Sequence, residues 1–344
     1  MLPEEKYSEL LKELDECQNP LFIFDDDPDG LCSFLLFYRY KKIGDWCFVK
    51  SLPKVSGDFV RYINNENDKI FILDMPEIDD DFFDNVNKPI IWVDHHPHEH
   101  PQHVKSFNPH DHGYNEKDTS TTALCYKTVN QDLWLASIGA VADWTMPDYI
   151  EKFKEIYPDL LNKDIINAPD ALFNSKLSKL IEIFSMILKG NTKISKQCIK
   201  KLMNIKSPYE LLLNDSKDTK FINKKISGIM NEYNEILKDA LNTKTEDGLL
   251  LYIYSEMYNS FSSEISNYLQ YKNPNDLVIV GRLKNGEYKL SIRSQNHNLN
   301  EILNKILIGL DAHGGGHDNA CGACVREEHF DEFILRIKNE LKTQ

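Results

Sequence analysis

Three short apolar runs in the first 100 residues end directly in aspartate, and this pattern constrains the fold more than any other feature of the sequence. Residues 21–24 lead into Asp25, residues 69–73 into Asp74 and residues 89–93 into Asp94. Helix-like stretches separate the runs, and short apolar strands alternating with helices are typical of a parallel sheet covered on both faces. Because the carboxyl ends of parallel strands lie at one edge of the sheet, we expect the three aspartates to meet there.

The pattern predicts an α/β protein with two sheets. In the first half we expect helices at 5–16, 31–43 and 119–142 and strands at 21–24, 47–49, 69–73 and 89–93. In the last hundred residues we expect strands at 249–254, 277–283 and 287–293, with Lys284-Asn285-Gly286 as a hairpin signal, and helices at 261–270, 299–309 and 327–341. No strand signal occurs between residues 151 and 245.

A chain of 344 residues has room for two or three domains. We predict an N-terminal parallel-sheet domain at 1–175, a basic helical connector at 176–245 and a smaller C-terminal α/β domain with a mixed sheet at 246–344.

The acidic strand ends carry the side chains that divalent metal ions prefer. Acidic residues crowd the turn Asp25-Asp26-Asp27-Pro28-Asp29-Gly30, and His95 and His96 follow Asp94. Five or six carboxylates at one sheet edge repel one another, so several would take up protons unless cations balanced them. Divalent cations accept aspartate oxygens and histidine nitrogens together. A single strand-end aspartate commonly caps a helix, but the combination predicts a metal site.

Charge is distributed unevenly along the chain. The formal net charge of −14 excludes a uniformly basic surface for duplex DNA. Residues 1–150 contain 13 basic and 28 acidic residues, whereas 176–225 contain 12 lysines and only 4 acidic residues. This lysine-rich segment is either solvated or a track for a nucleic-acid backbone, and the segment shows no interleaved aromatic platform.

The sequence favours a cytoplasmic protein without a membrane segment. Its seven cysteines are odd in number and scattered, and we find no signal peptide. No apolar run approaches the 18 residues that a membrane span needs.

Polar residues elsewhere are suited to phosphate contacts. Ser120 lies where a helix should begin, so helix capping and phosphate binding are both open to it. Arg293 ends a strand and can either join a surface salt bridge or fork onto a phosphate. The run Gly314-Gly315-Gly316-His317 reads as a glycine loop whose backbone amides can approach an anion. Together, Arg293 and this run predict a clamp for a substrate phosphate.

These motifs resemble those of the DHH phosphoesterase superfamily, which is named after the Asp-His-His string found here at Asp94-His95-His96. The turn DDDPDG resembles the first motif of the family and Leu73-Asp74 the second, while Asp143 in GAVADW resembles a late metal-binding aspartate. The string GGGHDNACG resembles the glycine-rich motif of the associated substrate-binding domain. Many relatives begin the first motif with His; Asp25 in that place is similar to the RecJ-type nuclease branch.

The resemblance implies two divalent metal ions, with Mn²⁺ favoured and Mg²⁺ an alternative. The implied ligands are Asp25, Asp27, Asp29, Asp74, His95 and Asp143. Asp74 is the expected bridging ligand, Asp94 is expected to orient the histidines, and His96 to face the scissile phosphate or the leaving group.

The function implied is that of a RecJ-like exonuclease acting on single-stranded DNA or RNA, or on short oligonucleotides. A partner protein in replication or repair is compatible with it. One alternative is a small-molecule phosphoesterase acting on dinucleotides or on 3′-phosphoadenosine 5′-phosphate. The other is a nuclease-like subunit of a replication or repair complex.

Overall fold

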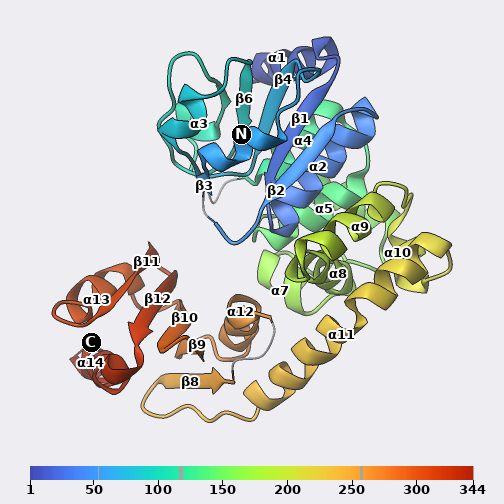
Figure 1. Cartoon of the computed structure of the whole chain (residues 1–344). Coiled ribbons are helices and arrows are strands. Elements are labelled where there is room, and N and C mark those ends of the chain that lie inside the picture. Colours follow the sequence, from blue (N-terminus) through green and yellow to red (C-terminus); the bar gives the residue numbers. More distant parts are fainter. Residues whose placement is uncertain (53, 116–118, 256–258, 344) are drawn as a thin grey trace. The chain divides into compact units, whose positions relative to one another are not determined.

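The computed structural model of the chain describes residues 1–52, 54–115, 119–255 and 259–343 (Figure 1). They form two compact units, Met1–Ile226 and Ser227–Gln344. Each unit contains a five-stranded sheet, and a two-stranded sheet accompanies the first. The predicted α/β class is therefore confirmed, while domain boundaries at 175 and 245 stay a prediction.

The first unit is built on a parallel sheet with the strand order β2-β1-β4-β6-β7. Its strands are β1 (Pro20–Asp25), β2 (Asp45–Val49), β4 (Lys69–Leu73), β6 (Ile90–Val93) and β7 (Lys105–Phe107). The four predicted strands are confirmed. Strand β7 has only three residues, too few for a recognisable apolar pattern, and the paired strands β3 (Lys54–Val55) and β5 (Glu77–Ile78) are shorter still.

Alternating side chains of β1 show that both faces of this sheet are covered. The ring of Phe24 stacks on Phe34 of α2 (Pro28–Lys41), with the ring centroids 4.4 Å apart. Leu21 and Ile23 point the other way, into a buried cluster that includes Phe59. That second face lies under η1 (Gly57–Tyr62) and α3 (Asp80–Asp84), whereas α4 (Thr121–Val129) and α5 (Leu133–Ala142) pack against α2.

Two predicted boundaries are wrong, for identifiable reasons. The single helix expected at 119–142 is two helices, because Asn130 and Asp132 adopt left-handed backbone angles with φ of 47° and 57°. The acidic turn is shorter than expected, because α2 begins at Pro28. Proline is suited to the first helical position, and the Asp27 side chain caps the helix by accepting from the backbone N–H of Gly30 at 2.9 Å.

The segment from 151 to 245, which the structure describes throughout, contains helices and no strand, as predicted. The helices of the first unit that follow α5 are α6 (Tyr149–Ile156), α7 (Ala168–Phe173), α8 (Leu177–Lys189), α9 (Thr192–Leu202) and α10 (Pro208–Leu213). Helix α11 (Lys217–Ala240) runs from the first unit into the second. None of the helices formed by the described residues is long and apolar enough to cross a membrane.

The second unit contains a mixed sheet with the order β11-β12-β10-β9-β8, in which β8 and β9 are parallel and the other pairs antiparallel. Its strands are β8 (Leu249–Tyr254), β9 (Leu277–Lys284), β10 (Glu287–Arg293), β11 (Ala312–His317) and β12 (Ala320–Arg326). Its helices are α12 (Ser262–Lys272), α13 (Leu299–Ile306) and α14 (Phe330–Thr343). The predicted hairpin is confirmed: Asn285 and Gly286 have φ of 53° and 75°, as a two-residue turn requires.

The expected glycine loop is wrong, because Gly314 to His317 belong to strand β11, which pairs with β12. Glycine disfavours strands, so the residue pattern contained no strand signal. Close packing explains the choice: a Cβ on Gly314 would lie 2.6 Å from the carbonyl oxygen of Gly322.

Candidate metal centre and active site

The predicted ligands meet at the carboxyl edge of the parallel sheet. Three groups of side chains place their ligand atoms within 4.8 Å of one another: Asp25, Asp27 and Asp74; Asp74, His95 and His96; and Asp29, His95 and Asp143. The groups overlap at Asp74 and His95, so they form one continuous centre. All six predicted ligands are in it, and His96 is the seventh member.

Asp74 occupies the middle of the centre. It follows β4 directly, is buried, and has a left-handed backbone with φ of 61°. Its N–H donates to the carbonyl of Val93 at 3.0 Å, which extends the pairing of β4 with β6, and the Thr121 hydroxyl donates to its Oδ1 at 2.8 Å. These bonds hold a carboxylate shared by two of the three groups, as a bridging ligand requires.

Asp29 is held by the N-terminus of α4. Its Oδ2 accepts from the N–H of Thr121 at 2.9 Å and its Oδ1 from the N–H of Thr122 at 2.8 Å. The Thr122 hydroxyl donates to the Asp29 carbonyl at 2.9 Å. Two amides of a helix start therefore fix the carboxylate. Sequence reasoning missed this contact because the partners are more than 90 residues apart.

A close backbone approach shapes the acidic turn. A Cβ on Gly30 would lie 2.8 Å from the backbone nitrogen and oxygen of Asp25, so only glycine fits. The Asp25 carboxylate accepts from the N–H of Asp26 at 2.8 Å, and the Asp26 carboxylate accepts from the N–H of Ser51 at 3.1 Å. Asp26 is thereby directed toward the loop after β2, while Asp25 and Asp27 join the centre.

The side chains of Asp94, His95 and His96 have two different sets of contacts. The buried His95 directs Nε2 to the carboxylates, 3.6 Å from Oδ1 of Asp74 and 3.8 Å from Oδ2 of Asp143. Asp94 instead binds His96, through Nδ1 at 3.0 Å and through the backbone N–H at 2.8 Å. In this structure Asp94 orients His96, and Nε2 of His96 is turned away from Asp94.

Asn108, which the sequence did not suggest as a site residue, fastens the loop that carries the histidines. Its side-chain amide donates to the carbonyl of His96 at 2.7 Å and lies 2.8 Å from Nε2 of His98, while its Oδ1 accepts from the N–H of His110 at 2.9 Å. The two backbone partners fix the orientation of the amide, so Nε2 of His98 is an acceptor. His98 also stacks on Trp92, with the ring centroids 3.7 Å apart.

Burial and mutual repulsion make the carboxylates of the centre poor acids. Burial, followed by the charges of neighbouring aspartates, raises the pKa of Asp25, Asp27, Asp74 and Asp143 above the usual range. Bound cations would offset the repulsion between these carboxylates. A set of carboxylate oxygens with one imidazole suits Mn²⁺ or Mg²⁺. The residues present therefore fit a divalent-metal centre.

Ser120 is used for capping in this structure. It is buried, and its hydroxyl accepts from the N–H of Ala123 at 3.3 Å at the start of α4. Contact with a substrate phosphate stays a prediction.

The second unit aligns the other predicted substrate-binding residues on one sheet face. Arg293 and His317 both pair with Ala320, from β10 and β11 on either side of β12, so their side chains project from the same face. Gly315 pairs with Gly322 and lies on the same face, two residues before His317. A Cβ atom at Gly315 would have no neighbour within 4 Å, so the backbone is open on this face. The Arg293 side chain donates to Asn267 and Ser263 of α12, and burial lowers its pKa to about 10.

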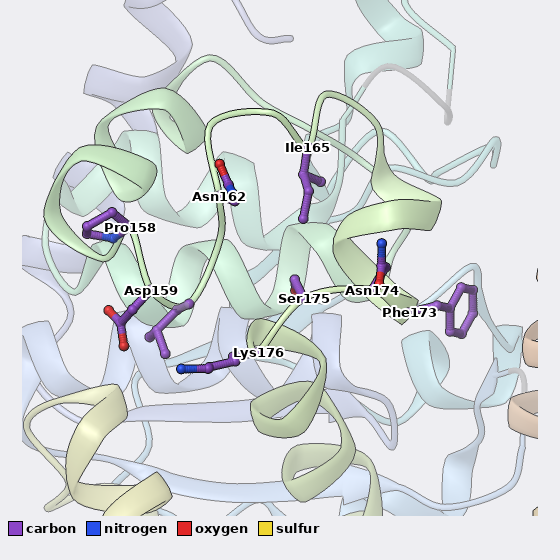
Figure 2. A pocket seen from close by; sticks show the side chains of 9 residues that line it. Pro158, Asp159, Asn162, Ile165, Phe173, Asn174, Ser175 and Lys176 are labelled. Atoms are coloured by element: carbon purple, nitrogen blue, oxygen red, sulfur yellow. The ribbon is translucent and has the colours of Figure 1, made fainter.

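A separate pocket of about 560 Å³ lies in the first unit, between the loops that flank α7. Figure 2 shows its lining, which includes Asn162, Ile165 and Phe173. None of the predicted site residues lines it, so this pocket is not the metal centre.

Two known families match the sequence. The family described as "DHH family, N-terminal domain" matches residues 21–150, and the "DHHA1 domain" matches residues 248–343. No curated protein sequence matches the chain.

Several solved structures have the same fold. RecJ from Thermus thermophilus in complex with Mn²⁺ has a TM-score of 0.68 at 14% identity; the match covers 100% of this chain and 55% of RecJ. A manganese-bound exonuclease RecJ has a TM-score of 0.64 at 15% identity; the match covers 99% of this chain and 95% of that protein. The pGpG-specific phosphodiesterase PggH of Vibrio has a TM-score of 0.54 at 14% identity; the match covers 95% of this chain and 99% of that protein. The chain thus spans about half the length of the Thermus protein.

Proposed function

Since the chain belongs to the DHH phosphoesterase superfamily as a RecJ-like member, we propose that it is a two-metal exonuclease that hydrolyses single-stranded DNA or RNA, or short oligonucleotides. The family supports a metal-dependent phosphoesterase, a hydrolase acting on phosphoester bonds. We further propose that its substrate is a nucleic-acid strand.

One observation carries the proposal: six side chains of the expected types converge at one sheet edge, and each of the six positions holds an oxygen or nitrogen ligand. Asp25, Asp27, Asp29, Asp74, His95 and Asp143 would hold two ions, with Asp74 between them. A pair of divalent ions, when bound, lowers the pKa of a water molecule and offsets charge on the phosphoryl oxygens. A subunit that served only as a scaffold would have no need of the complete ligand set.

The residues around the ligands have separate tasks in hydrolysis. One P–O bond forms from water, which releases a proton to the solvent, and the P–O bond to the leaving oxygen breaks as that oxygen takes up a proton. His96, whose Nδ1 is held by Asp94, would present Nε2 to the leaving oxygen and supply this proton. Thr121 and Asn108 hold Asp74 and the His96 backbone in place. On the second unit, Arg293, His317 and the exposed glycine backbone of β11 would bind a substrate phosphate.

The second candidate function is hydrolysis of a dinucleotide or another small phosphoester. The fold shared with the Vibrio phosphodiesterase favours it, since that protein is named for a dinucleotide substrate. Both candidates use the same metal centre and differ in the length of the substrate.

The test is a product ladder. Purified protein with Mn²⁺ is given single-stranded DNA and RNA of 2, 6, 12 and 24 nucleotides, labelled at either end. Stepwise shortening of the longer strands supports the exonuclease, and the label that is lost first gives the polarity. Hydrolysis of the 2-mer alone supports the small-molecule function and contradicts the exonuclease.

A further inference from the structure

Two cations from separate elements converge on one aromatic ring in the first unit. The guanidinium carbon of Arg61 and the ammonium nitrogen of Lys196 each lie 5.1 Å from the centroid of the Tyr62 ring. Arg61 and Tyr62 end η1, whereas Lys196 is on α9. Because both charges are this close to the same centroid, they are no more than about 10 Å apart.

These cations are not neutralised by ion pairs. Within the described parts of the chain, no carboxylate oxygen lies within 4.0 Å of the charged nitrogens of Arg61 or Lys196. Arg61 lies within residues 1–150, which contain 28 acidic and only 13 basic residues, whereas Lys196 lies in the lysine-rich segment. An anion that bound between the two charges would be attracted by both of them.

The Tyr62 ring and its two cations lie near β2, the strand that pairs with β1. The Tyr62 ring packs against the buried cluster that contains Cys47 and Val49 of β2. Cys47 is two residues before Val49, which pairs with Asp25. At about 3.3 Å per residue, this separation is roughly 7 Å along the strand.

Further basic residues lie directly after β2 and on α9. The Lys50 ammonium donates to the carbonyl of Leu188. Ser51, the next residue in the chain, donates its N–H to the Asp26 carboxylate at 3.1 Å, which holds the loop after β2 against the acidic turn. On α9, Lys193 precedes Lys196 by three residues and therefore lies on the same side of the helix.

We propose that Arg61, Tyr62 and Lys196 bind the single strand next to the nucleotide held at the metal centre, with Tyr62 stacking on a base and the two cations binding its phosphates. The inference rests on the proposed function and extends it to substrates longer than a dinucleotide. Base stacking on an aromatic ring flanked by cations is the common mode of binding single strands without sequence preference. Tyr62 comes from outside the lysine-rich segment, and the fold brings its ring to Lys196 of α9.

The test measures binding of a phosphorothioate-linked, fluorescein-labelled 12-nucleotide oligothymidylate in the presence of Mn²⁺. Tyr62→Leu keeps an apolar side chain against the buried cluster under η1, while Tyr62→Phe keeps the ring. We expect Tyr62→Leu to weaken binding about tenfold, within the range for one stacked base, and Tyr62→Phe to stay within twofold of the wild type. Equal melting temperatures of the two variants exclude a folding defect.

Salt dependence tests the cations. The double variant Arg61→Gln/Lys196→Gln should reduce the slope of log K against log salt by about 1.4, since each phosphate contact on a single strand contributes about 0.7. The control is Lys152→Gln on α6, which removes an exposed charge and should leave the slope unchanged.

Two outcomes would overturn the inference, and only the second would also overturn the proposed exonuclease activity. If the wild type degrades 12-mers and the Tyr62 and cation variants bind them with wild-type affinity and slope, the strand path is wrong and the exonuclease proposal stands. If the wild type neither binds nor shortens a 12-mer, the strand path and the exonuclease proposal are both wrong, even if dinucleotides or an acidic protein bind to this surface.

Discussion

Asn108 connects the loop that carries His95 and His96 to the rest of the sheet edge, and Asn108→Ala should lower both stability and turnover. The substitution removes two contacts made by the side-chain amide, to the carbonyl of His96 and to Nε2 of His98, and the bond that Oδ1 accepts from the N–H of His110. Asn108 is only 1% exposed, so water cannot fully replace these partners. At about 1 kcal/mol for each bond, the free energy of unfolding should fall by about 3 kcal/mol.

The effect on the reaction follows from His96. Without Asn108, the carbonyl of His96 loses its anchor, and the imidazole that we propose faces the leaving oxygen can shift. A misplacement of about 1 Å costs up to ~100-fold in rate. We therefore expect kcat to fall about 10- to 100-fold, while the bound metal content and KM change little, because no predicted ligand of the ions is removed.

Urea unfolding and initial rates on a short oligonucleotide with Mn²⁺ measure the two effects. Asn108→Asp should not rescue the rate, because a carboxylate can accept from His110 but cannot donate to the His96 carbonyl. Asn162→Ala is the matched control, since the exposed Asn162 side chain accepts only a local bond from Asp164 at 3.1 Å and its loss should cost about 0.5 kcal/mol or less. Wild-type kcat in a folded Asn108→Ala protein would refute the positioning role.

Four further results are expected. His95→Ala should reduce the Mn²⁺ content measured by mass spectrometry and lower the rate at least about 100-fold; full metal loading would contradict its role as a ligand. Adding Mn²⁺ at about 100 times its Kd to chelated protein should stabilise it by about 2.7 kcal/mol in thermal unfolding, and an unchanged melting temperature would exclude a metal centre that forms only in the folded state. Gly30→Ala should lower the melting temperature and metal affinity together, because a methyl group would clash with the Asp25 backbone; a wild-type melting temperature would show that the turn can yield. Arg293→Gln should raise KM or reduce the rate with metal content unchanged, and loss of bound metal would argue against a phosphate-binding role.

The parallel sheet and the acidic residues of the centre could be predicted because each depends on local pattern. Apolar runs identify β1, β4 and β6, and the aspartate after each run is placed by the direction of the strand. The first boundary of α2 was misjudged because Pro28 and Asp29 suit a turn and a first helical turn equally well.

Contacts between distant segments were not accessible to this reasoning. Thr121 reaches Asp74 and Asn108 reaches the His96 carbonyl across the fold, and neither residue type is unusual at a helix start or after a short strand. Tyr62 meets Lys196 only because η1 and α9 lie together in the folded unit. Strand β11 could not be recognised because its stability comes from close pairing with β12 and not from the propensity of its glycines.

The central claim is that the carboxylates around Asp74 support metal-dependent cleavage of phosphodiester bonds. The most direct measurement compares degradation of an end-labelled single strand by the wild type and by Asp74→Ala, with Mn²⁺ and with a chelator. We predict shortened products only from the wild type with Mn²⁺. Cleavage by Asp74→Ala at the wild-type rate, or cleavage that continues in the chelator, would contradict the claim.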